Sequence, residues 1–169
     1  MTDEDYMRLA IKEAKKSEKA GGDPIAAIIV KDEKVVASGW SFCDPEMNPT
    51  SHAEINCIKH ACSKLKTLDL EDCTMYCTLE PCSLCLGGIA WGHVSRVIFG
   101  SYNKDIMPEN PNELYRYSAI KRAHAIHALP EGGHANIRGG VLRKECAHLL
   151  SDYKNWHKVK HIVRRFLSQ

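Results

Sequence analysis

The chain has 169 residues, 44% of them hydrophobic and 26% charged, and its formal net charge is +2. This length favours one domain spanning residues 1–169, and the composition is that of an ordinary globular protein. No apolar run approaches the roughly 20 residues of a membrane span, and the acidic N-terminal segment is unlike a signal peptide. We therefore expect a cytoplasmic protein with no membrane partner. The net charge is too small to indicate nucleic-acid binding by itself.

Eight cysteines are many for an intracellular chain. In a reducing compartment they are expected to be metal ligands or buried apolar residues instead of disulfides. The cysteines expected to be buried as small apolar residues are Cys57, Cys62, Cys73, Cys77 and Cys146.

The pattern of apolar residues predicts strands that alternate with helices along the chain. In chain order the predicted elements are a helix over 3–19, a strand hairpin over 25–40, a loop over 41–50, a helix over 51–65, a strand over 73–79, a short helix opened by Pro81, a strand over 94–101, an irregular loop over 102–111, a helix over 112–126, a short strand over 135–139, and helix from 141 onward with a basic C-terminal part over about 152–169. Such alternation predicts an α/β fold, a three-layer α/β/α sandwich with helices on both faces of one sheet.

Two cysteines, Cys82 and Cys85, are separated by two residues at the start of the short predicted helix. At this spacing both thiols can turn toward one ion, and the helix N-terminus favours the thiolate form that zinc requires. Taken alone, the pair fits a redox pair, a zinc site or a coincidence of spacing.

A second segment, Ser51-His52-Ala53-Glu54, stands at the start of a predicted helix. Ser51 and Glu54 have the spacing of a helix capping box, which would occupy the glutamate carboxylate. The same carboxylate could instead serve a catalytic site, because helical side chains lean toward the N-terminus. Both readings stay open from this segment alone.

Together the two segments supply His52, Cys82 and Cys85, three protein ligands that leave one tetrahedral position for water. Three ligands are typical of catalytic zinc, whereas structural zinc is usually closed by four. A carboxylate next to that water, such as Glu54, would be the general base. The pattern His-x-Glu followed by Pro-Cys-x-x-Cys is the known signature of zinc deaminases.

With these motifs and the segment LEPCSLCLGGIAWGHVSRVIFG, the chain resembles the cytidine-deaminase-like superfamily, in the branch of bacterial guanine deaminases and tRNA-specific adenosine deaminases. The resemblance implies a mixed five-stranded sheet, a homodimer, and one Zn²⁺ per chain held by His52, Cys82 and Cys85. It also implies that Glu54 transfers protons while an amino group is removed from a base.

The resemblance further implies substrate contacts from residues spread along the chain, and these are Ile25, Ser41, Ala53, Trp91 and Asp105. Ser41 stands where the family has an asparagine, and Asp105 could accept hydrogen bonds from the edge of guanine. Cys43 lies in the loop near the predicted pocket. Leu86, Ile89 and Trp91 are expected to be buried.

Three functions follow from these features. A guanine-like base or nucleoside is the favoured substrate, and adenosine in a tRNA anticodon loop is the alternative. Basic residues near the C-terminus favour tRNA as a partner. They also fit the solvent-exposed face of a helix whose apolar face packs on the rest of the domain. A non-catalytic, zinc-stabilised partner subunit is the third reading, against which the presence of Glu54 argues.

Overall fold

The computed structural model describes residues 1–106 and 136–151. The predicted helix over 112–126 and the basic segment over about 152–169 lie outside these ranges, so a single domain over the whole chain stays a prediction. The described elements are α1 (Asp3–Lys19), β1 (Ala26–Lys31), β2 (Lys34–Trp40), α2 (Cys43–Glu46), α3 (Ala53–Leu65), β3 (Thr74–Leu79), α4 (Ser83–Trp91), β4 (Arg96–Ser101), α5 (Asn103–Ile106), β5 (Asn136–Gly139) and α8 (Arg143–Ser151).

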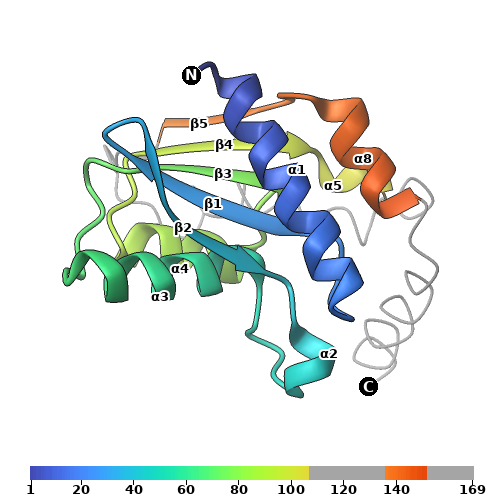
Figure 1. Cartoon of the computed structure of the whole chain (residues 1–169), viewed down its shortest axis with the longest axis horizontal. Helices are drawn as coiled ribbons and strands as arrows, with labels where there is room; N and C mark the ends of the chain where they lie inside the picture. Colours follow the sequence, from blue (N-terminus) through green and yellow to red (C-terminus); the bar gives the residue numbers. More distant parts are fainter. Residues whose placement is uncertain (107–135, 152–169) are drawn as a thin grey trace.

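The strands form one mixed sheet of five strands in the order β2-β1-β3-β4-β5 (Figure 1). The β1–β2 and β1–β3 pairs are antiparallel, whereas β3–β4 and β4–β5 are parallel. A parallel pair needs a crossover connection, and α4 supplies it between β3 and β4. The mixed α/β sheet predicted from the sequence is confirmed.

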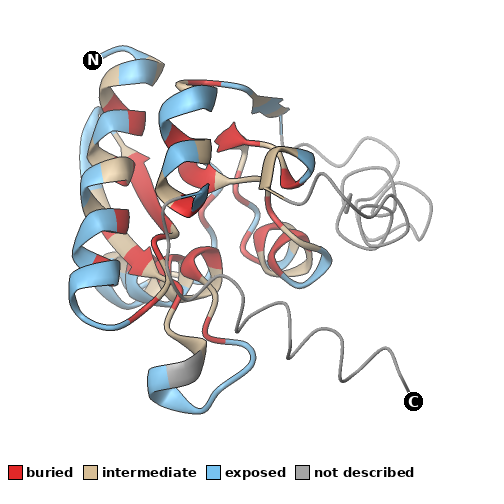
Figure 2. Cartoon of the chain, turned by 90° about the vertical axis from the view of Figure 1, so that its right-hand side faces the viewer, coloured by how far each residue is buried: buried red, intermediate tan, exposed pale blue. Residues whose placement is uncertain are grey.

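Helices cover both faces of the sheet. Helices α1 and α8 lie on one face, and α3 and α4 lie on the other (Figure 1). The side chains of β1 alternate between the two cores, because successive residues of a strand point to opposite faces. Ala27 and Ile29 join the core beneath α3, and Ile28 and Val30 join the core beneath α1. The central strands β1, β3 and β4 are mostly buried, the edge strands β2 and β5 are partly exposed, and the helices have exposed outer surfaces (Figure 2).

Helix α1 is fixed at its first turn. Thr2 and Asp5 form a reciprocal capping box, which satisfies amides at the helix start. The Asp3 carboxylate accepts hydrogen bonds from the Arg96 guanidinium at 2.8 and 3.1 Å and from the Tyr76 hydroxyl at 2.9 Å. These contacts join the helix to β3 and β4, far along the chain.

The segments that form the site meet where the start of β1 lies beside the ends of β2 and β3. This arrangement follows because β1 runs antiparallel to both neighbours. Helix α3 begins at this edge of the sheet and packs very closely on β2. A Cβ atom placed on Gly39 would lie 2.3 Å from both the Ala53 carbonyl oxygen and the Cys57 amide nitrogen. Only glycine permits this approach, which brings the first turn of α3 against the sheet.

Local predictions differ from the structure at two places. The predicted loop over 41–50 contains the short helix α2. Pro81 precedes α4 instead of opening it, since Cys82 is the N-cap residue. None of the helices in the described ranges has the length and apolar character needed to cross a lipid bilayer.

Candidate functional site

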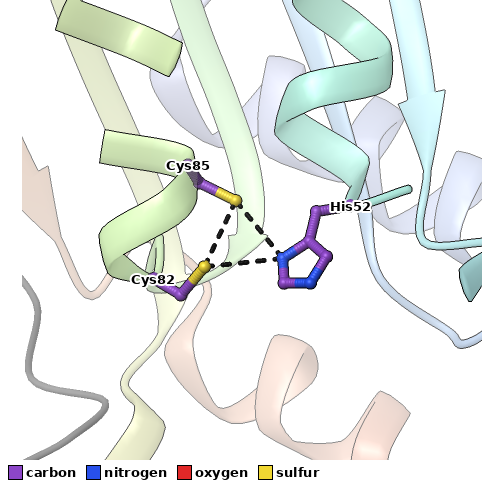
Figure 3. Close-up of side chains that lie close together, drawn as sticks. All are labelled: His52, Cys82 and Cys85. Atoms are coloured by element: carbon purple, nitrogen blue, oxygen red, sulfur yellow. Dashed lines mark hydrogen bonds between the residues drawn. The ribbon is translucent and has the colours of Figure 1, made fainter. Parts of the chain in front are cut away.

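Three side chains from two helix starts meet at one point (Figure 3). Nδ1 of His52 lies 3.4 Å from Sγ of Cys82 and 3.4 Å from Sγ of Cys85, and the two sulfur atoms are 3.5 Å apart. His52 is the N-cap of α3 and Cys82 is the N-cap of α4. Cys85 is the third residue of α4, a position whose side chain lies beside that of the N-cap.

The triangle of donor atoms matches the size of a zinc site. Tetrahedral bonds of about 2.3 Å to sulfur and about 2.0 Å to nitrogen imply edges of about 3.8 Å between sulfurs and about 3.5 Å between sulfur and nitrogen. The observed edges of 3.5 and 3.4 Å are within about 0.3 Å of these values. Two thiolates and one imidazole are ligands that zinc prefers. His52, Cys82 and Cys85 are therefore placed to bind a metal ion, and one tetrahedral position remains for a non-protein ligand.

Glu54 lies beside the triangle and is not one of its corners. It is the second residue of α3, it is buried, and its Oε2 is 3.2 Å from the Cys85 sulfur, which donates to it. Burial raises the pKa of this carboxyl group above its ordinary value, because the charged form loses hydration. A buried acid next to the metal position can hold or release a proton there.

The capping-box reading of Ser51 and Glu54 is wrong. The N-cap of α3 is His52, and its side chain makes no capping hydrogen bond. The Ser51 hydroxyl donates to the Glu46 carboxylate at 2.7 Å and accepts from the Asn56 amide at 2.8 Å. Ser51 therefore holds the loop before α3 in place, and Glu54 is left to the site.

The protonation states of the metal-free ligands follow from their mutual contacts. Hydrogen bonds with Cys43 and Cys82 raise the pKa of His52 to about 10. The hydrogen bond with Cys85 and the nearby His52 lower the pKa of Cys82 to about 4. The contact with Cys82, and burial, raise the pKa of Cys85 well above its ordinary value. At neutral pH the metal-free site thus contains an imidazolium, a thiolate and a thiol.

Three of the residues predicted to contact substrate lie at the same edge of the sheet. Ile25 precedes β1 and is half-buried, and its carbonyl oxygen accepts from the Ser41 amide at 3.0 Å. Ser41 is buried, and its hydroxyl donates to the Asp23 carboxylate at 2.7 Å. Ala53 is buried at the first position of α3. Their contact with a substrate stays a prediction.

Trp91 and Asp105 are placed differently from these three. We expect Trp91 to be buried, but it is 87% exposed at the far end of α4, about 9 Å along the helix axis from Cys85. Asp105 accepts two hydrogen bonds from the Arg143 guanidinium at 2.6 and 2.9 Å. This pairing lowers the pKa of Asp105. The carboxylate is engaged within the protein.

The sequence reasoning assigned no role to two further residues near the ligands. The thiol of Cys43 donates to the carbonyl oxygen of Ser51, the residue before His52, at 3.5 Å. Glu80, two residues before Cys82, accepts from the Asn103 amide at 3.0 Å and so ties the metal-binding turn to α5. Neither contact has a local sequence signal, because the partners are distant or in an irregular loop.

Of the other cysteines, Cys57, Cys73, Cys77 and Cys146 are buried as predicted, and Cys62 is half-buried. Burial raises the pKa of both Cys57 and Cys77 far above its ordinary value, so these thiols stay protonated.

Comparison with known proteins agrees with this geometry. Residues 1–101 match the family described as the cytidine and deoxycytidylate deaminase zinc-binding region. The chain is 34% identical to a tRNA-specific adenosine deaminase of Bacillus subtilis, over 99% of this chain and 98% of that protein. It is 31% identical to a guanine deaminase of Bacillus subtilis, over 77% of this chain and 84% of that protein.

Solved structures give the same picture. A structure from studies of A-to-I editing by tRNA:A34 deaminases superposes with a TM-score of 0.70 and 28% identity, over 85% of this chain and 97% of that one. The guanine deaminase of Bacillus subtilis superposes with a TM-score of 0.62 and 29% identity, over 76% of this chain and 93% of that one. The family match and these similarities show that the chain belongs to the cytidine and deoxycytidylate deaminase family. Together with the placement of His52, Cys82 and Cys85, they identify it as a zinc-dependent deaminase.

Proposed function

We propose that this deaminase acts on adenosine in the anticodon loop of tRNA, with Glu54 as the proton-transferring residue. The reaction consumes one water and converts the adenine base to hypoxanthine, giving inosine and ammonia. The observation that carries the catalytic part is the burial of Glu54 at 3.2 Å from a zinc ligand.

The position of Glu54 suits both proton transfers. Zinc, when held by His52, Cys82 and Cys85, supplies positive charge that lowers the pKa of a water molecule toward neutrality. Glu54 would take a proton from the attacking water and deliver it to a ring nitrogen of the base. It would then assist the departure of ammonia. Burial moves the pKa of Glu54 upward, toward the range in which a carboxyl group both accepts and returns a proton.

Two observations favour adenosine in tRNA over a free guanine-like base. The similarity to the Bacillus subtilis tRNA-specific adenosine deaminase extends over nearly the whole of both chains. The residue-based support for guanine came from Asp105, and that carboxylate is held by Arg143. The contribution of the basic segment over about 152–169 stays a prediction, because the segment lies outside the described residues.

A guanine-like base or nucleoside remains the second candidate. It is supported by the 31% identity to a guanine deaminase and by the structural similarity to the same enzyme. Both candidates use the same zinc site and differ in the recognition of the base and of the surrounding polymer.

Ammonia release from the zinc-loaded protein would test this proposal. The substrates are an anticodon stem-loop with adenosine at the first anticodon position, and free guanine, guanosine, adenine, adenosine, cytosine and cytidine. We expect turnover of the stem-loop, weakened by salt because binding would release counterions. Turnover of free guanine or guanosine with an inert stem-loop would favour the second candidate.

Glu54→Gln is the matched control, since it keeps the shape of the side chain and removes its proton transfer. This variant should bind zinc at one ion per chain and lose turnover by at least about 100-fold. Retained turnover would contradict the role of Glu54. An inactive wild-type chain that gains activity only with an added deaminase would support the non-catalytic subunit.

We also propose that the chain forms a homodimer through the outer face of α4. Leu84 and Trp91 are seven residues apart on one side of this helix and are 43% and 87% exposed. Gly87 lies between them, so the face is apolar and nearly flat. An exposed Trp91 fits a subunit contact better than a pocket wall in its own subunit.

Sedimentation velocity would test the dimer with Trp91→Glu and, as a control, Leu68→Glu in an exposed turn. We expect the first variant to be monomeric and the second to remain dimeric. A monomeric wild-type chain at micromolar concentration would contradict the proposal.

The cytoplasmic location stays a prediction.

A further inference from the structure

Helix α4 begins at a metal ligand whose side chain does not cap the helix. Cys82 is the N-cap residue, and it makes no side-chain capping hydrogen bond. An N-cap side chain usually fixes the helix start by accepting a hydrogen bond from a backbone amide of the first turn. The Cys82 sulfur lies in the donor triangle instead. Contacts outside α4 are therefore needed to fix the backbone that carries this sulfur.

Glu80, two residues before Cys82, makes three such contacts. The parallel register of β3 and β4 ends with the pair Leu79 and Ser101. Beyond this pair, the Glu80 amide donates to the Ser101 carbonyl at 2.9 Å. The Glu80 carboxylate accepts from the Asn103 backbone amide at 3.0 Å, and the Glu80 carbonyl accepts from the Asn103 side-chain amide at 3.4 Å. Backbone and side chain of Glu80 thus join the chain leaving β3 to the chain leaving β4.

The link between Glu80 and Cys82 has little freedom. It consists of Pro81 alone, which is buried and whose ring holds φ at about −65°. On the other side of Cys82, its carbonyl oxygen accepts from the Leu86 amide at 2.9 Å, as α4 begins. A displacement of Glu80 would therefore be passed to the Cys82 backbone and to its sulfur.

The turn that carries Asn103 is itself anchored. The Tyr102 amide donates to the Asp105 carboxylate at 2.9 Å, and the Asp105 amide donates to the Tyr102 carbonyl at 2.9 Å. The Arg143 guanidinium of α8 donates to the same carboxylate at 2.6 and 2.9 Å. Asn103 is buried in this turn. None of these contacts involves a metal ligand, so the turn is in place in the metal-free protein.

We propose that Glu80 and Asn103 are positioning residues for zinc, which hold the turn before α4 so that the Cys82 sulfur lies at its corner of the donor triangle before the ion binds. A site whose ligands are already in place binds its ion more tightly, because less ordering is needed on binding. Neither residue is a metal ligand in this role. Both act through the backbone of the metal-binding turn.

Zinc affinity in matched variants, measured by competition with a chromophoric chelator, tests this role. We expect Glu80→Ala to bind zinc about tenfold more weakly than wild type, the lower end of the loss for partners of metal ligands, since the effect passes through the backbone. Glu80→Gln should recover most of the affinity, because its side-chain oxygen can accept from the same amide. Asn103→Ala keeps the backbone amide and should lose less than Glu80→Ala.

Two control variants separate positioning from general effects. Glu71→Ala removes an exposed glutamate near the other end of β3 and should match wild-type affinity. Asp3→Asn removes the charge that faces Arg96 at the start of β4, so it weakens the fold away from the metal. Its zinc affinity should also match wild type, provided that the metal-free protein is folded by circular dichroism.

Cobalt(II) in place of zinc reports the ligands through its visible absorption. At saturating cobalt the spectra of Glu80→Ala and wild type should agree, because the same three side chains bind the ion and only the cost of assembling them differs. A changed spectrum would overturn the inference, since it would indicate an altered ligand set.

Wild-type zinc affinity in Glu80→Ala would also overturn the inference. Equal losses in Glu80→Ala and Glu80→Gln would contradict the hydrogen bond, and an equal loss in Asp3→Asn would indicate general destabilisation. If Glu80→Ala does not fold without metal, Glu80→Asp replaces it, since it keeps the charge and shortens the reach by one carbon; unchanged affinity there refutes the proposal. Substrate turnover enters none of these measurements, so the result is independent of the proposed function.

Discussion

Zinc binding by this chain should release two protons per ion near neutral pH. In the metal-free site the pKa of His52 is raised to about 10, and the pKa of Cys85 is raised well above its ordinary value, so both groups carry a proton at pH 7. The pKa of Cys82 is lowered to about 4, so this sulfur is already a thiolate. Zinc requires a neutral histidine and two thiolates, and it must therefore displace one proton from His52 and one from Cys85.

The size and sign of the pH effect follow from this count. Each displaced proton changes the zinc association constant tenfold per pH unit, so two protons imply about 100-fold, or about 2.7 kcal/mol, per unit. This two-proton dependence should hold between about pH 4, where Cys82 loses its proton, and about pH 10, where His52 does, and affinity should rise with pH throughout this range. Acidification below neutrality should weaken binding steeply.

Zinc affinity would be measured by chelator competition at pH 6.5, 7.0 and 7.5, and released protons would be counted with an indicator in weak buffer. Glu54→Gln serves as the control, since it removes a buried carboxyl group that accepts a hydrogen bond from the Cys85 thiol. We expect this variant to keep a release of two protons. A release near zero, with an affinity independent of pH, would refute the assigned protonation states of His52 and Cys85.

Three further outcomes test the fold. Gly39→Ala should destabilise the protein by about 3 kcal/mol in urea unfolding, because the new Cβ would meet backbone atoms of α3, including the Cys57 nitrogen at 2.3 Å; unchanged stability would show that α3 can move away. Asp3→Asn should lower the free energy of unfolding by about 1–2 kcal/mol, because the substitution removes the negative charge that faces Arg96. Glu4→Gln, which removes the exposed ion pair with Arg8, should lower it by less than about 0.5 kcal/mol. Removing zinc should lower the melting temperature, since free zinc at 100 times its dissociation constant contributes about 2.7 kcal/mol to stability; equal melting curves with and without chelator would contradict this coupling.

The sequence predicts the framework well where the information is local. The helix over 3–19 is confirmed to the residue, and the hairpin over 25–40 is confirmed by the antiparallel pairing of β1 and β2. His52, Cys82 and Cys85, which the structure places to bind a metal ion, are predictable because a metal requires residue types at definite spacings. Chemistry of this kind is readable without knowledge of the fold.

The sequence failed where a distant partner decides. Ser51 and Glu54 have the right spacing to cap α3, but contacts with Glu46 and Cys85 direct them elsewhere. The pairing of Asp105 with Arg143, which lies 38 residues later, has no local signal, and the contact of Asp105 with a substrate stays a prediction. Trp91 has the hydrophobicity of a core residue and is 87% exposed. Such outcomes depend on tertiary packing, which local patterns do not encode.

The exposed turn between α3 and β3 divides the site between two parts of the chain. Leu68 in this turn is 85% exposed. His52 and Glu54 precede the turn, while the two cysteine ligands follow it. Cutting the chain after Leu68 would give two fragments, neither of which could complete the metal site or the sheet alone. Zinc would then bridge them, so their reassociation should depend on the metal, and this deaminase offers a natural division point for a zinc-controlled split protein.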